Sequence, residues 1–254
     1  MHRFFAPELD PGDEHVDLPG DEAEHLTRVL RLGPGDVIAV FNGRGREYLA
    51  SVATAARRAV RVRLLSSVEP AREAAVDVTL VQAVLKGDRM DEVVRDAVML
   101  GVGAVQPIVS RRTETTVAAL LRGARIDRWR RVALASVKQC RRAVLPEIRS
   151  PLTLGNWLGE PLPELSLMFV EPNAGDTVEP LAALKHLPAP RSAAMLVGPE
   201  GGWDPAERAE ARDRGVRLVS LGTRTLRGDA VPIVALGILQ FLWDEPLATE
   251  RRRS

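Results

Sequence analysis

Two short stretches near the end of the 254-residue chain combine glycines with residues that could do chemistry. The first, residues 196–203, reads LVGPEGGW, and the second, residues 221–230, reads LGTRTLRGDA. Each follows an apolar run typical of a buried strand and precedes a predicted helix. In an open α/β sheet, loops at the carboxyl ends of strands are where ligands bind. The two loops are therefore the candidate ligand site.

Three charged residues in these loops are candidates for catalysis, namely Glu200 in the first loop and Arg227 and Asp229 in the second. An arginine can stabilise negative charge that develops on a substrate, and a carboxylate can orient that arginine or bind a ligand. Simpler roles fit the same residues, because Arg227 could anchor its loop through carbonyl groups and Glu200 could cap the amides of its own loop.

Other kinds of site are poorly supported by the sequence. The single Cys140 and the scattered His2, His15, His25 and His186 show no metal-ligand spacing, so no metal is expected. The chain has no Gly-x-Ser-x-Gly elbow and no Walker A sequence, and no acidic ribose partner follows the glycines at the expected spacing. Residues 198–202 therefore indicate a loop around a nucleoside cofactor more than a pyrophosphate-binding loop.

Composition indicates a soluble globular protein, with 45% hydrophobic and 27% charged residues. One cysteine excludes an internal disulfide and fits a reducing cytosol. Residues 1–8 lack the apolar core of a signal peptide, and no apolar run is long enough to cross a bilayer. We therefore expect a cytoplasmic protein without a membrane partner.

Positive charge is concentrated in two regions, residues 25–63 and residues 111–149, where arginines outnumber acidic residues. Clustered arginine is the pattern expected of a protein that binds the phosphate backbone of a nucleic acid. A solvated arginine-rich surface is the alternative, because only three of the 35 basic residues are lysines.

The first part of the chain is predicted to be mainly β-structure, with one helix over 21–31. Asp21 can cap that helix, and Arg28 and Arg31 share one of its faces. A polar, proline-containing linker is expected over 66–73. The expected strands span 2–6, 15–18, 37–42, 46–53 and 58–65.

From the linker onward, strand and helix patterns alternate, which predicts a parallel sheet. Asp204, Pro205 and Glu207 together indicate a capped helix start. The helix over 230–243 is apolar nearly all round, so it must be buried on several sides, either in the monomer core or at a subunit interface. Strands are expected at 76–85, 104–109, 165–170, 193–197 and 217–220, and further helices at 88–100, 125–140, 178–187 and 204–214.

The GPEGGW loop followed by LG and LRxxA resembles the SPOUT superfamily of S-adenosylmethionine-dependent RNA methyltransferases. Within that superfamily it is most similar to the 16S ribosomal RNA uracil-N3 methyltransferases. Further similarity lies in RFF at 3–5, HLTRVLRL at 25–32 and SRRT at 110–113. The resemblance implies an α/β fold with a trefoil-knotted methyltransferase domain at 71–254, after a small PUA-like β-barrel RNA-binding domain at 1–70. It also implies a homodimer.

The resemblance further implies that the enzyme methylates N3 of a uridine in small-subunit ribosomal RNA. Loss of the N3 proton would leave an imide anion, and Arg227 is the candidate to stabilise it. The implied cofactor-binding residues are Leu196, Gly198, Pro199, Glu200, Gly201, Leu221, Gly222, Thr225, Leu226 and Arg227. The residues expected to bind RNA are Arg3, Arg28, Arg31, Lys86, Arg111, Arg112, Arg141 and Arg142.

This chain departs from the family pattern at four positions. Met99 and Lys138 replace glutamates, Gly228 replaces a threonine, and Asp229 supplies the expected carboxylate with one methylene less than glutamate. Two other functions remain open. One is a relative that methylates a ribose 2′-hydroxyl or another base, and the other is a weakly catalytic RNA-binding factor of ribosome assembly.

Overall fold

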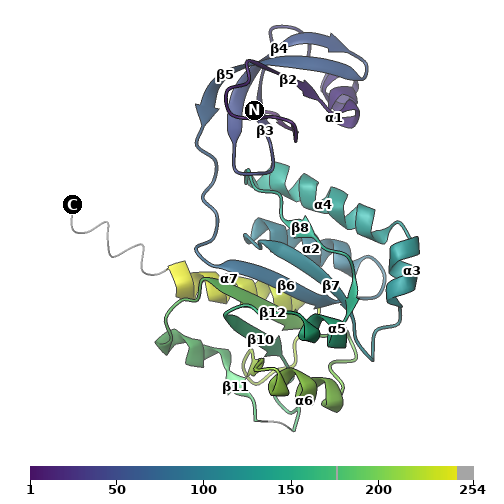
Figure 1. The fold of residues 1–254 in the computed structure, drawn as a ribbon, viewed down its shortest axis with the longest axis vertical. Helices are drawn as coiled ribbons and strands as arrows, with labels where there is room; N and C mark the ends of the chain where they lie inside the picture. Colours follow the sequence, from purple (N-terminus) through teal and green to yellow (C-terminus); the bar gives the residue numbers. More distant parts are fainter. Residues whose placement is uncertain (176, 245–254) are drawn as a thin grey trace, which may run out of the picture. The chain divides into compact units, whose positions relative to one another are not determined.

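The computed structural model describes residues 1–175 and 177–244, which form two compact units (Figure 1). The first unit contains Met1–Glu73 together with Val137–Leu145, and the second contains Ala74–Ser136 and the chain from Pro146 onward. The boundary between Glu73 and Ala74 lies just beyond the predicted domain boundary at residue 70. The segment Val137–Leu145, assigned to the second domain from the sequence, belongs to the first unit.

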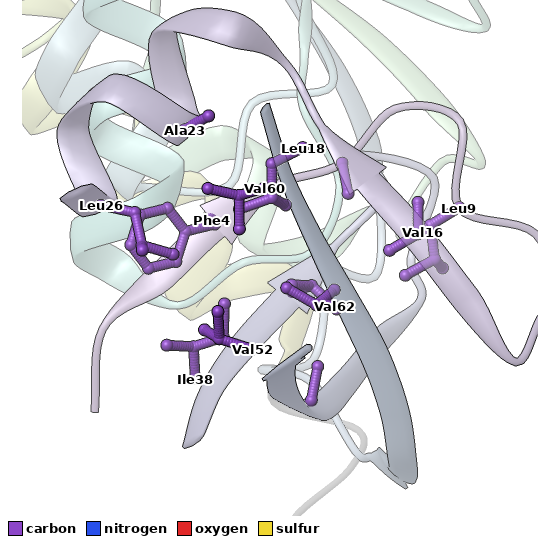
Figure 2. Close-up of a cluster of buried hydrophobic side chains, with 13 residues drawn as sticks. Phe4, Leu9, Val16, Leu18, Ala23, Leu26, Ile38, Val52, Val60 and Val62 are labelled. Carbon is purple, nitrogen blue, oxygen red and sulfur yellow. The ribbon is translucent and has the colours of Figure 1, made fainter. Parts of the chain in front are cut away.

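The first unit is built around a curled five-stranded sheet with the order β1-β3-β4-β5-β2. Strands β1 and β3 are parallel and the other pairs are antiparallel. The buried hydrophobic side chains of this unit, among them Phe4, Leu26 and Ile38, gather inside the curl (Figure 2). The strands are β1 (Arg3–Phe5), β2 (His15–Leu18), β3 (Val37–Phe41), β4 (Glu47–Ala56) and β5 (Ala59–Val68).

The helix predicted over 21–31 has a different form in the structure. Helix α1 (Gly20–Glu24) continues as the π-helical turn η1 (His25–Val29), and Pro19 rather than Asp21 occupies the N-cap position. Arg31 lies beyond the helix with φ +57°, and the Leu32 amide bonds the Leu26 carbonyl. A left-handed residue of this kind closes a helix end. The expectation that Arg28 and Arg31 share a helix face is therefore wrong.

The second unit contains an eight-stranded sheet whose order is β11-β13-β10-β12-β6-β7-β8, with β9 also paired to β7. Every pairing in it is parallel, so the predicted α/β parallel sheet is confirmed. The strands are β6 (Asp77–Ala83), β7 (Ala104–Val109), β8 (Glu147–Ile148), β9 (Leu152–Thr153), β10 (Leu165–Phe169), β11 (Glu179–Pro180), β12 (Ser192–Val197) and β13 (Arg217–Ser220).

The helices of the second unit follow the predicted positions closely where the apolar pattern is long. In α6 the predicted capping box is present. The Asp204 carboxylate accepts a hydrogen bond from the Glu207 backbone amide, and the Glu207 carboxylate accepts one from the Asp204 backbone amide. Region 178–187 instead holds β11 and the 3₁₀ helix η2, and the short α3 and α5 were not predicted. The helices are α2 (Arg89–Met99), α3 (Val117–Arg122), α4 (Arg125–Cys140), α5 (Leu154–Gly159), α6 (Pro205–Asp213), η2 (Leu181–His186) and α7 (Ala230–Asp244).

The sheet order determines where the glycine loops meet. Strand β10 lies between β12 and β13 and runs parallel to both, so all three carboxyl ends reach the same edge of the sheet. The segments that follow these strands begin at Val170, Gly198 and Leu221. Sequence positions about fifty residues apart are thereby brought to one place, which is the candidate site.

Candidate functional site

The first glycine loop forms a compact turn after β12. The Gly202 amide bonds the Pro199 carbonyl at 2.9 Å, and Gly202 has φ +67°, a conformation that favours glycine. The following side chain, Trp203, is buried and its Nε1 donates to the Phe169 carbonyl at 2.9 Å. These bonds hold the loop against the end of β10, and its residues 198–203 form one wall of a cavity.

The second loop packs directly onto the first. A Cβ atom added at Gly228 would stand 3.2 Å from the Gly198 carbonyl oxygen and 3.3 Å from Leu85 Cδ2. Contacts this short at a Cβ require the neighbouring atoms to move, and here one neighbour is backbone. Gly228, which stands where the related family has threonine, therefore allows the backbones of the two loops to approach closely.

A cavity of about 590 Å³ lies between the two loops and the segment that follows β10. This volume is in the range of small-molecule and cofactor sites. Its lining combines glycines and apolar residues with seven charged residues, which suits a nucleoside with polar edges. Of the expected cofactor-binding residues, the structure places Gly198, Pro199, Glu200, Gly201, Leu221, Thr225, Leu226 and Arg227 in the lining.

Two expected cofactor-binding residues do not line this cavity. Leu196 is fully buried in β12, where its side chain belongs to a hydrophobic cluster beneath the sheet edge. Gly222 lies on the exposed side of its loop with φ +90°. Leu196 therefore belongs to the core, and Gly222 belongs to the solvent-exposed part of its loop.

The cavity also has charged lining residues that are not among the predicted site residues, namely Arg89, Glu171, Arg208 and Arg224. The position of Glu171, soon after the apolar strand at 165–169, was a usable signal because it occupies the same edge of the sheet as the glycine loops. Arg89 follows β6, which is paired in parallel with β12, so it also lies at this edge of the sheet and the same signal applied to it.

Arg227 and Asp229 form an ion pair on the wall of the cavity. Arg227 Nη2 lies 2.6 Å from Asp229 Oδ2, and Arg227 Nε donates to Oδ1 at 3.1 Å. Glu200 is not the partner of Arg227. Its Oε1 accepts hydrogen bonds from the Lys86 amide at 3.0 Å and from Arg89 Nη1 at 3.1 Å. Glu200 thus joins the first glycine loop to the start of α2.

The basic loop after β7 is also fixed onto the first glycine loop and α6. Arg112 Nη1 donates to the Gly201 carbonyl at 2.8 Å, and the Arg111 amide bonds the buried carboxylate of Glu207 at 2.7 Å. The guanidinium groups of Arg111 and Arg112 remain exposed to solvent near Asp204, at 3.5 and 3.8 Å from its carboxylate oxygens. This arrangement places positive charge beside the cavity.

Lys86 lies at the same edge and is exposed. Its Nζ forms an ion pair with Glu114 Oε1 at 2.5 Å. The hydrogen bond that the Lys86 ammonium donates to Glu114 is the main reason that the pKa of Lys86 is raised above its usual value, and desolvation opposes this shift. Lys86 therefore stays positively charged at neutral pH.

The residues predicted to bind RNA fall into two groups in the structure. Six of them are exposed, namely Arg28, Arg31, Lys86, Arg111, Arg112 and Arg141. The other two, Arg3 and Arg142, are held inside the first unit by protein partners. The sequence did not distinguish these groups because arginines in both have similar neighbours along the chain.

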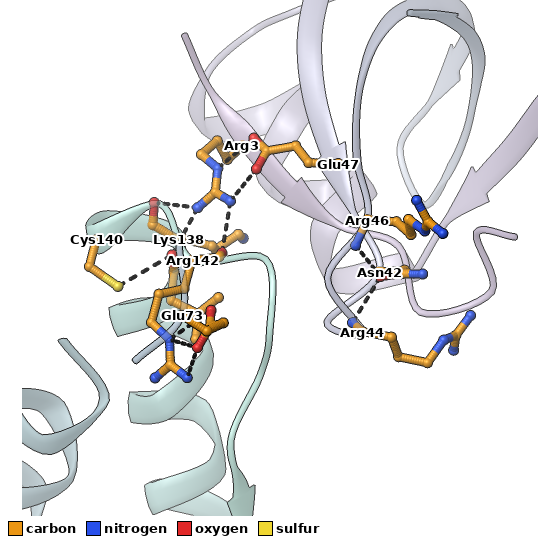
Figure 3. Close-up of polar contacts among 10 residues, drawn as sticks. Arg3, Asn42, Arg44, Arg46, Glu47, Glu73, Lys138, Cys140 and Arg142 are labelled. Carbon is orange, nitrogen blue, oxygen red and sulfur yellow. Dashed lines mark hydrogen bonds and ion pairs between the residues drawn. The ribbon is translucent and has the colours of Figure 1, made fainter. Parts of the chain in front are cut away.

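Arg3 and Arg142 belong to a network that connects Val137–Leu145 to the rest of the first unit (Figure 3). Arg3 bonds both carboxylate oxygens of Glu47 at 2.8 and 2.9 Å and also donates to the Arg142 carbonyl. Arg142, only 4% exposed, pairs with Glu73 at 2.5 Å. Buried, paired guanidinium groups cannot reach a phosphate, so these two residues are not part of the RNA surface proposed below.

Lys138, one of the four departures from the family pattern, is part of the same unit. Its Nζ lies 2.6 and 2.7 Å from the two carboxylate oxygens of Glu22, whose side chain is buried. A buried carboxylate requires a partner of opposite charge. The lysine is therefore matched to an acidic residue that is remote in sequence. Met99 lies on the exposed side of α2, as predicted from its angle on the helix.

Helix α7 is buried on one side and exposed on another. Ala235, Leu236, Leu239 and Trp243 are buried, and the helix lies beside α2. Its exposed apolar side chains are Ile233, Val234, Ile238 and Phe241, of which Phe241 is 70% exposed. Within the described residues, no helix is both long and apolar enough to span a membrane. Those residues also contain no cluster of three or more potential metal-ligating side chains.

Comparisons with known proteins agree with this arrangement. Residues 72–240 match the RNA methyltransferase domain family, and residues 18–65 match the RNA methyltransferase PUA domain. The chain is 34% identical over 235 residues to the ribosomal RNA small subunit methyltransferase E of Synechocystis sp., an alignment that covers 89% of this chain and 73% of that protein. It is 32% identical over 254 residues to the protein of that name from Mycobacterium bovis, covering 95% and 93%.

A solved structure is similar over nearly the whole chain. It is the Neisseria gonorrhoeae ribosomal RNA small subunit methyltransferase E bound to S-adenosyl methionine, with 30% identity and a TM-score of 0.84. The superposition covers 96% of this chain and 98% of that one. The similarity therefore includes both units, and with them the edge of the sheet where the cavity lies.

Proposed function

Because this chain belongs to the RNA methyltransferase family, we propose that it transfers a methyl group from S-adenosylmethionine to N3 of a uridine in small-subunit ribosomal RNA. The observation that carries the proposal is the cavity formed by the two glycine loops, with the exposed guanidinium of Arg227 on its wall. The related proteins named above act on small-subunit ribosomal RNA, and one of them binds this cofactor. The position of the methyl group on uracil is the finer part of the proposal.

The cofactor is held mainly by backbone in this proposal. Residues 198–201 and the loop residues Leu221, Thr225 and Leu226 line the cavity, and Gly228 allows the two loops to close upon each other. When bound, S-adenosylmethionine supplies a methyl group that is already activated by its sulfonium. The protein then contributes mostly alignment of the reacting groups.

Arg227 acts on the other reactant. N3 of uridine carries a proton, and its loss leaves negative charge on the imide. A guanidinium fixed at the cavity wall stabilises that charge as it develops. Asp229 holds Arg227 in place through two hydrogen bonds, and it takes the role of the family's longer carboxylate. Glu200 positions the first loop against Lys86 and Arg89.

RNA binding uses exposed cations from both units. Arg28, Arg31 and Arg141 belong to the first unit, and Lys86, Arg111 and Arg112 to the second. Phosphate contacts from such residues are independent of sequence and position the RNA, whereas the cavity selects the base. The protein works as a homodimer that covers the exposed apolar side of α7, because an apolar helix face of this kind is otherwise left in water.

Mapping the modified nucleotide tests this function. Small ribosomal subunits from a strain that lacks the gene are incubated with the purified protein and S-adenosylmethionine, and the RNA nucleosides are then identified by mass spectrometry. Appearance of 3-methyluridine at one site supports the proposal. A 2′-O-methylated nucleoside or another methylated base would replace the target but keep the enzyme class. Binding of RNA without methylation would indicate an assembly factor instead.

A further inference from the structure

The charged residues that line the cavity differ in whether protein groups already bond their side chains. Four of the five arginines in the lining have such partners. These contacts join Arg89 to Glu200, Arg112 to the Gly201 carbonyl, Arg208 to the carbonyls of Trp203 and Ala174, and Arg227 to Asp229. Within residues 1–175 and 177–244, Glu171 and Arg224 line the cavity with charged side chains that bond no protein group.

These two residues come from different strands but reach the same cavity. Glu171 follows β10, and its Oε1 would stand 3.3 Å from a Cβ atom added at Gly202, so the carboxylate lies against the first glycine loop. Arg224 lies in the loop after β13, the strand paired with β10. One negative and one positive group thus face a single cavity, and neither side chain has a partner among the residues that the structure describes.

A ligand with both charges would match this arrangement. The amino-acid end of S-adenosylmethionine carries an ammonium and a carboxylate, whereas its adenosine end has no charge. We infer that Glu171 binds the ammonium and Arg224 binds the carboxylate of the cofactor. The inference rests on the cofactor of the proposed function and is independent of which nucleotide in the RNA is methylated.

The energetic reason is the cost of removing two charges from water. A charged group that enters a cavity loses hydration, and this loss is recovered only where a group of opposite charge and suitable hydrogen bonds replace the water. Backbone from the glycine loops can bond the neutral adenosine end, but it does not neutralise the zwitterion. Glu171 and Arg224 would therefore select cofactors that carry the amino-acid end.

Two ligands separate the amino-acid end from the rest of the cofactor. S-adenosylhomocysteine and 5′-methylthioadenosine share adenine, ribose and a neutral sulfur, but only the first has an ammonium and a carboxylate. Calorimetric titration measures the affinity of the full-length protein for each. Glu171→Gln and Arg224→Gln should each weaken S-adenosylhomocysteine about tenfold, which corresponds to about 1.4 kcal/mol. Their affinity for 5′-methylthioadenosine should equal that of the wild type.

Matched controls remove charges that do not line the cavity. Glu210 on α6 and Arg131 on α4 are exposed, and Glu210→Gln and Arg131→Gln should leave both affinities unchanged. Thermal unfolding of all four variants checks that they are folded, which is expected because each altered side chain is exposed.

Three results would overturn the inference. Equal weakening of both ligands by Glu171→Gln would assign that carboxylate to the ribose. Unchanged affinity for S-adenosylhomocysteine in both variants would remove the two residues from cofactor binding. Failure of the wild type to bind either ligand would remove the cofactor as well. Methylation of a different nucleotide, by contrast, would change the proposed target and leave these binding results intact.

Discussion

Arg227 and Asp229, two positions apart after β13, form a two-point ion pair in which Nε meets Oδ1 at 3.1 Å and Nη2 meets Oδ2 at 2.6 Å. The two partners differ in exposure. The Arg227 side chain is 71% exposed, whereas that of Asp229 is only 15% exposed. The enclosed carboxylate therefore holds an accessible guanidinium at the cavity wall, where a substrate base can reach it.

Replacement of Arg227 by alanine should lower kcat roughly a hundredfold or more, by analogy with the loss of one donor from an oxyanion hole. Cofactor affinity should stay nearly constant, because the interaction belongs to the transition state. Steady-state kinetics and calorimetry measure the two quantities. Arg227→Lys keeps the charge without the planar fork, so partial rescue would indicate that charge matters more than geometry. If Arg227 only anchors the loop, alanine would instead lower stability and cofactor affinity together.

Asp229 offers a test of the departure from the family's glutamate. Asp229→Glu restores the longer side chain and should preserve or raise kcat. Asp229→Asn keeps the size but removes the charge, and loss of a charge-assisted pair of hydrogen bonds should lower kcat by about tenfold. Turnover at saturating RNA and cofactor gives the comparison. Equal activity of the asparagine variant and the wild type would show that Asp229 does not hold Arg227 in its active position.

Gly198→Val should abolish cofactor binding while the protein stays folded. A Cβ atom at this position would stand 3.2 Å from both Cε2 and Nε1 of the Trp203 indole, so the branched side chain must displace the loop. Calorimetry with S-adenosylhomocysteine measures binding, and circular dichroism checks folding. Gly159→Val is a useful comparison, because a Cβ atom there would meet no atom within 4 Å. A folded Gly198→Val variant with wild-type affinity would remove this loop from the cofactor site.

Arg141 and Arg142 are neighbours in sequence with different expected roles. Arg141→Gln removes an exposed charge, so it should weaken RNA binding and reduce the dependence of log affinity on log salt by about 0.7. Arg142→Gln removes a buried guanidinium from its pair with the half-buried Glu73 and should lower the free energy of unfolding by about 2 kcal/mol. Salt-dependent binding assays and urea denaturation measure these effects. A wild-type salt dependence in Arg141→Gln would remove that residue from the RNA surface.

The exposed side of α7 can be tested through the oligomeric state. Phe241→Glu should shift the protein from dimer to monomer, because a charge would be buried at the centre of an apolar interface. Sedimentation equilibrium measures the mass. Leu121→Glu is the matched control, since Leu121 is 57% exposed on α3 and should leave the dimer intact. A monomeric wild type would show that α7 does not mediate dimerisation.

Long periodic patterns in the sequence were sufficient to locate most of the fold. The apolar stripe from Met90 to Val98 predicted α2, and the Asp204–Pro205–Glu207 signal predicted the start of α6. These features are local, because a helix face or a capping box depends on residues a few positions apart. Short elements such as α3 and α5 carry too few residues to show a period. The end of the helix before Arg31 was not predicted, because a left-handed residue at a helix end is usually glycine and here it is an arginine.

By itself, the sequence determined the parallel α/β architecture, the two glycine loops and the residues at their tips, since a strand that ends in glycines is a local signal. Only the tertiary structure decided which charged side chains are accessible to RNA or to the cofactor. Arg142 and the adjacent Arg141 look alike in sequence, yet Arg142 is buried and paired with Glu73, which is remote along the chain, whereas Arg141 is exposed. The structure likewise shows Asp229 as the partner of Arg227, and within the described part of the chain it shows none for the Glu171 side chain. The physical reason is that the state of a charge depends on groups brought near by folding, which sequence spacing does not encode.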